Sequence, residues 1–503
     1  MPLLIEKPLI LGERPVLASI FLVVVLAVCY VVGRAIYNAF FHPLAKFPGP
    51  KLWATSRIPY ALEIFRGHPH KTILQLHDEY GDIVRLAPNQ LSFRHDNAWK
   101  DIKGHRKAGR GEHGKDRIVY HEQRIGLLAS DREGHARQRR ILAHGFSAQS
   151  MAEQQPLIKS YVDLLLQRLH ERCEDGSKPL NLVSWYNWTT FDIIGDLAFG
   201  ESFDCLRESE YHPWVSLIFD HMKTKAIRAV LVRWPSVFKF ADTLVPRSMQ
   251  RKFEDNFKLT QRKVASRLSL GTPRPDFMES MVVAGNNMTR EEIEVNAILL
   301  IIAGSETTAT ALSGATYFLA THPQVLAKLT DEVRSSFQSE DEIDLHSVAK
   351  LRYMLAVLDE TMRIYPPVPS ASPRLVTPGG DTICGEFVPD GTTLDIWQWV
   401  VYHSSKNFTL PESFIPERWL GDPRFANDNK DVFQPFSFGP RNCLGKNLAY
   451  AEMRLILARV IWNFNLTLAE DSKNWLDQEC YDPIGTTSED GRAKRWDNSD
   501  KVT

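Results

Sequence analysis

Residues 436–445 read FSFGPRNCLG, and residues 446–462 continue as KNLAYAEMRLILARVIW. The apolar residues of the second stretch have the spacing of an amphipathic helix, and Cys443 stands between a Gly-Pro turn and the start of that helix. Free backbone N–H groups and the dipole at a helix start favour negative charge, so the sequence predicts a lowered thiol pKa for Cys443. Arg441 adds a positive charge two residues earlier.

Gly439 and Gly445 flank this cysteine. We expect their missing side chains to leave space for the close approach of a bulky planar partner. A single thiolate beside such a surface suits the axial ligand of a haem iron. A redox-sensitive thiol is the alternative that this stretch leaves open.

The composition excludes several classes of protein. The 503 residues include 60 Lys+Arg and 61 Asp+Glu, giving a net charge of −1, which argues against a general nucleic-acid binder. The cysteines are scattered without a C-x-x-C pair, so neither a zinc site nor a disulfide scaffold is expected, and a reducing compartment fits. They are Cys29, Cys173, Cys205, Cys384, Cys443 and Cys480.

The N-terminal region contains an uncharged apolar run, PVLASIFLVVVLAVCYVVG, at residues 15–33. As a helix it would span roughly 28 Å, close to the thickness of a hydrocarbon core. We expect an uncleaved transmembrane anchor; a cleaved signal peptide is the alternative. Cations follow the run at Arg34, Lys46, Lys51 and Arg57, and the positive-inside rule then places the body in the cytosol. The four N-x-S/T sequons are therefore interpreted as chance matches.

The rest of the chain divides simply. Residues 1–40 form the anchor segment, and residues 41–54 are a proline-rich hinge. Residues 55–503 show no internal linker and predict one large, helix-rich domain with small sheets. Within it, residues 80–93 have the alternation of a hairpin that turns at Pro88-Asn89.

A long buried helix is predicted from Arg290 to about Thr321, because Thr289 and Glu292 form a capping box and His322-Pro323 stops the pattern. Its middle reads AGSETT, residues 303–308. Gly304 would let a flat group approach the backbone, and Glu306 with Thr307 supplies the carboxylate and hydroxyl needed to pass protons inward. The alternative is a structural threonine whose hydroxyl donates a hydrogen bond to a carbonyl of its own helix.

Two further patterns carry charge. Glu360 and Arg363, in ETMR, share one face of a predicted helix and contribute little if exposed. Buried with Arg418 of the PERW stretch, they would form a structural clamp. In GHARQRR, residues 134–140, His135 and Arg139 share a helix face and would grip carboxylates; a solvated basic surface is the alternative.

Together these patterns resemble the cytochrome P-450 family. FSFGPRNCLG fits the haem-binding pattern F-x-x-G-x-R-x-C-x-G at every fixed position, while AGSETT, ETMR and PERW are similar to three further motifs of the family in the same order. The resemblance covers about residues 15–490. It implies an α+β fold, mainly α with small β-sheets, with a long central helix over the haem and one preceding transmembrane helix. FHPLAKFPGPKLWA and GHARQRRILAHGFS look most like fungal secondary-metabolism members, the isotrichodermin C-15 hydroxylase-like group.

The resemblance assigns roles to single positions. It implies that Cys443 is the axial ligand of haem b, that Phe436 packs beside the cysteine loop and that Gly304 lies against the haem. Proton delivery to dioxygen falls to Glu306 and Thr307, and the clamp of Glu360, Arg363 and Arg418 serves folding and haem retention. The haem propionates would be held by Arg441, Arg139, His135 and Arg374; His135 stands where the family has tryptophan.

The implied activity is a monooxygenase that inserts one atom of O2 into a lipophilic terpenoid or polyketide. No flavin or nicotinamide motif is present, so electrons are expected from NADPH–cytochrome P-450 reductase, with cytochrome b5 a second candidate, docking near residues 137–140 and Lys446. Location in the endoplasmic reticulum membrane follows. Substrate contacts are expected from residues 109–130, 297–303, 368–371 and 484–485. The alternatives are a haem-thiolate isomerase or dehydratase that needs no external electrons, and a non-catalytic haem binder.

Overall fold

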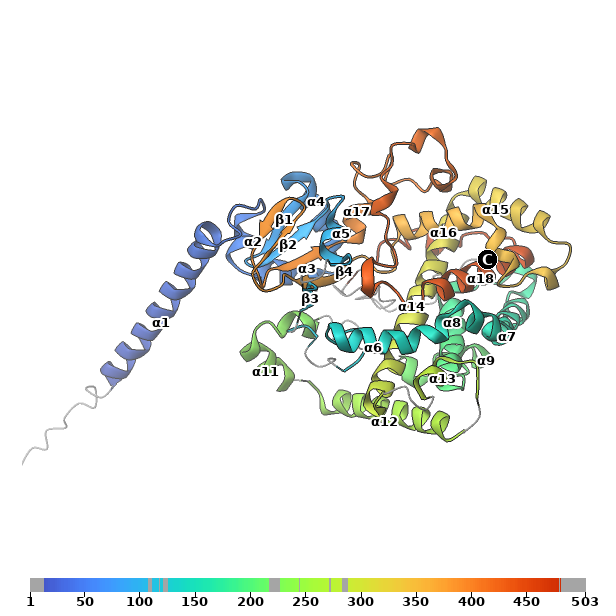
Figure 1. The fold of residues 1–503 in the computed structure, drawn as a ribbon, viewed down its shortest axis with the longest axis horizontal. Coiled ribbons are helices and arrows are strands. Elements are labelled where there is room, and N and C mark those ends of the chain that lie inside the picture. The colour runs from blue at the N-terminus through green and yellow to red at the C-terminus, as the bar shows by residue number, and fades with distance from the viewer. Residues whose placement is uncertain are drawn as a thin grey trace, which may run out of the picture.

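A computed structural model describes residues 13–106, 111–116, 118–120, 125–216, 227–243, 245–270, 273–282, 288–478 and 480. Helix α1 (Glu13–Ile36) projects away from a body in which a small sheet lies beside a larger helical part (Figure 1). Two helices of the described chain are long and apolar enough to cross a membrane. The most apolar 18-residue window of the first, Val16–Phe41, has no buried residue, whereas 56% of the corresponding window of the second, Arg290–Thr321, is buried, and the second is the core helix of the body.

The larger sheet has five strands in the order β1-β2-β7-β4-β3. Strands β1 (Ile83–Ala87) and β2 (Gln90–Phe93) form the predicted hairpin around Pro88 and Asn89. β2 pairs in parallel with β7, which continues the sheet through antiparallel β4 to the short edge strand β3. The remaining strands are β3 (Gly114–Lys115), β4 (Ala371–Leu375) and β7 (Thr393–Ile396), with β5 (Asp381–Ile383) and β6 (Glu386–Val388) forming a separate hairpin.

The helical part surrounds α14 (Arg290–Thr321), which passes through the middle of the body (Figure 1). The predicted capping box is present, because Thr289 accepts from the Glu292 N–H and Glu292 accepts from the Thr289 N–H. α14 packs along α8 (Leu182–Phe199) and also touches α16 (Arg352–Ile364) and α18 (Lys446–Asn463). Buried leucine, isoleucine and phenylalanine side chains from all four helices belong to one continuous core.

Local sequence explains where several of these helices begin and end. The Asp131 carboxylate caps α6 (Arg132–Ala143) by accepting from the Gly134 N–H at 2.8 Å. Asn181 caps α8 in the same way, and Gly200, at φ 76°, ends it. The remaining helices of the described chain are α2 (Lys51–Thr55), α3 (Ile58–Arg66), α4 (Pro69–Tyr80), α5 (Ala98–Lys103), α7 (Ala148–Arg172), α9 (Cys205–Glu208), α11 (Pro235–Thr243), α12 (Arg247–Ser269), α13 (Phe277–Val282), α15 (Pro323–Ser336) and α17 (Gln398–Tyr402).

Candidate functional site

A cavity of about 340 Å³ lies between α14, the cysteine loop and the edge of the larger sheet. Its wall has an apolar part, contributed by several elements, and a basic part. Apolar lining comes from Leu127, Leu128, Ile194, Leu299, Leu300, Met362, Val368 and Leu448, and basic or potentially basic lining from Lys103, Lys115, His135, Arg139, Arg374 and Arg441. Three of the four segments expected to contact substrate contribute residues to this wall, while residues 484–485 lie outside the described chain.

The cysteine loop is closed by hydrogen bonds of its own backbone. The Cys443 N–H donates to the Phe436 carbonyl at 2.8 Å, and the Asn442 N–H donates to the Gly439 carbonyl at 3.1 Å. Gly439 has φ +77°, and a Cβ there would lie 1.9 Å from the Lys103 carbonyl oxygen. This glycine therefore makes room for the end of α5, a constraint that the sequence did not indicate, and its expected role beside a planar partner stays a prediction. Phe436 lines the cavity and packs against Tyr450 of α18, with ring centroids 5.0 Å apart.

Cys443 itself is exposed toward the cavity. Contrary to the expectation from sequence, burial by the surrounding protein raises the pKa of its thiol. The backbone N–H groups of Gly445 and Lys446, with the cations of Arg139 and Lys446, act in the opposite, lowering direction. The predicted helix-start N–H groups are thus in place, with Arg139 and Lys446 as the nearby cations where the sequence predicted Arg441, but desolvation outweighs them all. A bound metal ion would reverse this balance, because coordination deprotonates a thiol.

The basic wall brings together all four predicted propionate ligands. His135 is 7% exposed, and burial, followed by the nearby charges of Arg441 and Arg139, lowers its pKa to about 3, so the imidazole is neutral. Lys103 and Lys115 also line this wall, and sequence reasoning missed both. Neither belongs to a recognisable motif; only the folding of α5 and β3 beside β4 brings them to the site.

The arginines of the basic wall differ in their partners. Arg139 donates to the carbonyl and side-chain oxygens of Asn442, at 2.7 and 2.5 Å. Arg441 forms an ion pair with Glu112 and donates to the Ser130 carbonyl at 3.0 Å. Arg374 is 4% exposed, and its Nη1 has no hydrogen-bond partner within the described residues. A buried cationic wall with an unmet donor fits the carboxylate groups of haem.

On α14, the Thr307 hydroxyl lines the cavity and donates to the Ala303 carbonyl at 2.7 Å. Glu306 is 6% exposed and, one residue along the helix, projects about 100° away from Thr307. Gly304 lines the cavity, but a Cβ there would lie 2.6 Å from Ile194 Cδ1. A side chain at this position would have to displace the flexible end of Ile194, so the glycine eases the packing of α14 on α8, a role that the sequence did not indicate.

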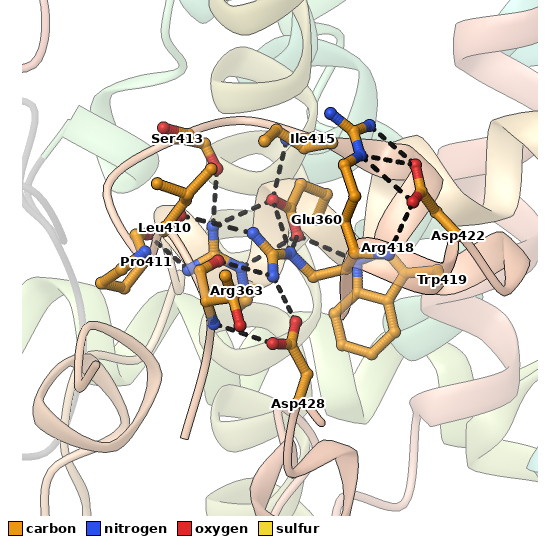
Figure 2. Close-up of polar contacts among 12 residues, drawn as sticks. Glu360, Arg363, Leu410, Pro411, Ser413, Ile415, Arg418, Trp419, Asp422 and Asp428 are labelled. Atoms are coloured by element: carbon orange, nitrogen blue, oxygen red, sulfur yellow. Dashed lines mark hydrogen bonds and ion pairs between the residues drawn. The ribbon is translucent and has the colours of Figure 1, made fainter. Parts of the chain in front are cut away.

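Glu360, Arg363 and Arg418 meet with completely buried side chains (Figure 2). Glu360 accepts from Nε and Nη2 of Arg363, both at 2.9 Å, and also from the Trp419 indole N–H at 2.9 Å. Sequence reasoning missed Asp428, whose buried carboxylate forms an ion pair with Arg418. Arg363 donates to the carbonyls of Pro411 and Ser413, at 2.7 and 3.0 Å.

The clamp therefore secures most of the irregular segment that leads from residue 404 to the cysteine loop. The guanidinium groups donate to backbone carbonyls as well as to carboxylates. These buried hydrogen bonds hold the backbone of a segment that has little regular secondary structure.

Comparisons with known proteins agree with this geometry. The sequence profile of the cytochrome P450 family matches residues 48–488. A trichothecene C-15 hydroxylase of Fusarium sporotrichioides is 51% identical over 454 residues, covering 89% of this chain and 92% of that protein. The cytochrome P450 monooxygenase astA of Talaromyces wortmannii is 45% identical (91% and 93% covered), and an averantin hydroxylase of Dothistroma septosporum is 44% identical (92% and 86% covered). The predicted family and fold class are confirmed: the chain belongs to the cytochrome P450 family and is a monooxygenase of that family.

Proposed function

We propose that this chain is a membrane-anchored haem b monooxygenase that oxidises a lipophilic intermediate, a terpenoid or a polyketide, in a fungal secondary-metabolite pathway. One observation carries the proposal: Cys443, a basic wall and Thr307 line the same cavity. Family membership supports haem-thiolate chemistry, and the mainly apolar lining supports a lipophilic substrate. The names of the relatives support the substrate class, since they include a trichothecene hydroxylase and an averantin hydroxylase.

The residues present fit a haem. Cys443 would supply its thiolate to the iron, and Phe436 would pack beside the cysteine loop. The basic wall would hold the two propionates. Arg374, Arg139, Arg441 and His135 are the propionate ligands in this proposal, and Gly304 is the part of α14 that would lie against the ring. When bound, the haem supplies the activation of dioxygen and the insertion of one oxygen atom.

The reaction also needs a supply of protons, and the chain offers two groups on α14 for this purpose. Thr307 holds its proton on Oγ1, in a hydrogen bond to the Ala303 carbonyl that a half-turn of the side chain can redirect into the cavity. Glu306 is the next residue and supplies a carboxylate for passing protons to the hydroxyl. An isomerase or a non-catalytic binder has no use for this pair, which favours the monooxygenase over both alternatives.

The anchor and its flanking charges support a single-pass protein of the endoplasmic reticulum, with residues 55–503 as one catalytic domain in the cytosol. α1 is the anchor, and exposed apolar side chains of the neighbouring α2 and α3, at Leu52, Ile58 and Leu62, suit contact with the lipid. Two of the four sequons, at Asn187 and Asn407, are buried, in agreement with their interpretation as chance matches.

Electrons are proposed to come from NADPH–cytochrome P-450 reductase, with cytochrome b5 as a second donor. Arg140 and Lys446 are exposed on α6 and α18, next to the cysteine loop, and would attract an acidic partner. Arg137 contributes less to such a surface than the sequence predicted, because it forms an ion pair with Glu292.

The decisive test is expression with the reductase in a host supplied with terpenoid and polyketide precursors, under isotopically labelled dioxygen. A product that carries one labelled oxygen atom and requires NADPH supports the proposal. Conversion that proceeds without NADPH would instead identify an isomerase or dehydratase. Ligand-induced spectral shifts without turnover of any precursor, and unaltered in Thr307→Ala, would identify a haem binder.

A further inference from the structure

Two consecutive carboxylates of α16 hold the chain on the two sides of the cysteine loop. Glu360 accepts from Arg418 and from the Ile415 N–H, which belong to the segment before the loop. Asp359, one residue earlier, accepts from the hydroxyl of Tyr450 at 2.7 Å, and Tyr450 belongs to α18, the helix after the loop. Unlike Glu360, neither Asp359 nor Tyr450 lies in any of the four motifs.

The ring of Tyr450 connects this hydrogen bond to the cysteine loop. It packs against the ring of Phe436, with centroids 5.0 Å apart and an angle of 46° between the ring planes. The Phe436 carbonyl accepts from the Cys443 N–H at 2.8 Å, so the phenylalanine and the cysteine are joined across the loop. Phe436 and Cys443 line the cavity, whereas Tyr450 does not. Tyr450 therefore supports the loop from outside the cavity.

Nearby cations strengthen this arrangement. Burial raises the pKa of Asp359 to about 6, while the Tyr450 hydroxyl and the charges of Arg454 and Lys446 act in the lowering direction. The carboxyl group is therefore predominantly ionised at neutral pH, and a hydrogen bond to an ionised acceptor is stronger than one between neutral groups. The Arg454 guanidinium also lies 5.2 Å from the centre of the Tyr450 ring, and Lys446 Nζ lies 5.9 Å from that of Phe436. Such cation–π contacts favour the observed placement of both rings.

We propose that Tyr450, fixed by Asp359, is a positioning residue for the cysteine loop. It keeps the Phe436 ring packed beside the loop, and this ring keeps water and additional hydrogen-bond donors away from the Cys443 sulfur. Hydrogen bonds to a ligating sulfur, and its exposure to solvent, set the reduction potential of the iron. Because a hydrogen bond withdraws electron density from the thiolate, a loosened loop raises that potential. The inference rests on the proposed haem function.

Reduction potentials of the haem-loaded protein test the proposal. Tyr450→Phe keeps the ring and loses the hydrogen bond, and Tyr450→Leu also loses the ring. We expect the equilibrium between ferric and ferrous iron to move toward the ferrous form by about 3-fold in the first variant and by about 10-fold in the second, which is about 59 mV for one electron. The iron–sulfur stretching band in the resonance Raman spectrum should move to lower frequency in the same order. Tyr450→Phe alone decides the question if Tyr450→Leu does not retain haem.

Tyr161→Phe is the matched control. The Tyr161 hydroxyl donates to the Asp196 carboxylate at 2.8 Å, between α7 and α8, and neither residue lines the cavity. Both Tyr→Phe variants lose one hydrogen bond to a carboxylate, so urea denaturation should show similar losses of stability. Only Tyr450→Phe should also change the potential and the Raman band.

Two results would overturn the positioning role. The first is a wild-type potential and a wild-type Raman band in the Tyr450 variants. The second is a shifted potential with an unmoved band, because a change of nearby charge alone produces that result. Asp359→Asn removes the charge but keeps an acceptor for the Tyr450 hydroxyl, so it should leave the band in place. These readouts do not require turnover: a wild-type chain without a haem-thiolate spectrum would overturn the proposed function as well, whereas unaltered variants of a chain with that spectrum count against this inference alone.

Discussion

Arg418 Nε donates to both carboxylate oxygens of Glu360, at 3.2 and 3.1 Å, and neither side chain is exposed. The same carboxylate accepts from Arg363 on its own helix and from the Ile415 N–H at 2.9 Å (Figure 2). One carboxylate of α16 thus fixes the backbone that approaches the cysteine loop. Two arginines around a single buried glutamate would be unfavourable alone, and the Asp428 carboxylate balances the second charge.

Removing this carboxylate should damage the fold. We expect Glu360→Gln to lower the free energy of unfolding by about 3–5 kcal/mol, because it leaves buried guanidinium charge unpaired. Urea denaturation of the haem-loaded protein measures the change. Glu386→Gln is the matched control, since Glu386 also forms an ion pair, with Lys46, but both of those side chains are about half exposed. It should cost less than about 1 kcal/mol. Equal effects of the two variants would contradict a structural role for the clamp.

The assignment of Cys443 has a spectroscopic test. Cys443→Ser should abolish the red-shifted Soret band that the reduced carbonyl complex shows when a thiolate is the axial ligand. Cys173→Ser, at the end of α7 and away from the cavity, should retain the band in full. Persistence of the band in Cys443→Ser would mean that another residue binds the iron.

Thr307→Ala should uncouple electron use from product formation. Without the hydroxyl, protons reach the reacting oxygen less efficiently, and we expect product formed per NADPH to fall by about 10-fold or more, with hydrogen peroxide released instead. Ser313→Ala is a close control, because Ser313 donates to the carbonyl four residues earlier on the same helix, at 2.8 Å, as Thr307 does. Equal product per NADPH in both variants would show that the Thr307 hydroxyl only makes a hydrogen bond within the helix and delivers no protons.

Local signals were sufficient to predict the capping box of α14, the hairpin around Pro88 and Asn89, and the cysteine loop before α18. They failed where distant segments meet. The need for glycine at 439 comes from the backbone carbonyl of Lys103, more than 300 positions earlier, and Gly304 lies against the movable end of the Ile194 side chain. Both glycines lie in motifs that predict contact with a planar ligand, and the contacts with Lys103 and Ile194 are a further constraint that local sequence does not show.

Charge was harder to predict than shape. The sequence placed a helix start and one cation, Arg441, beside Cys443, yet burial decides the direction of its pKa shift, and burial depends on the whole fold. Lys115 was not predicted either, because its position also depends on the whole fold. A two-residue strand has no periodicity to detect, and only its pairing with β4 brings Lys115 to Arg374.

A second buried carboxyl group has no counterpart in the motifs. Glu452 on α18 is 2% exposed, lines the cavity, and has no hydrogen-bond partner for Oε1 within the described residues. Burial alone raises its pKa to about 8. At neutral pH the group is therefore predominantly a neutral carboxylic acid in the folded protein, whereas in the unfolded chain it is ionised.

This difference predicts how stability depends on pH. Below about pH 4 both states bind the proton, and Glu452 contributes no pH dependence. Between that value and about 8 only the folded state holds it, so stability contributed by the protonated group is lost as pH rises, by about 1.4 kcal/mol per unit at most, and then levels off. Glu452→Gln, which cannot ionise, should remove this slope and leave the protein more stable than wild type at pH 8. Unfolding free energies from urea titrations at several pH values measure it, with the exposed Glu386→Gln as control. Parallel pH profiles for the wild type and Glu452→Gln would show that Glu452 is ionised in the fold and has a partner for its charge.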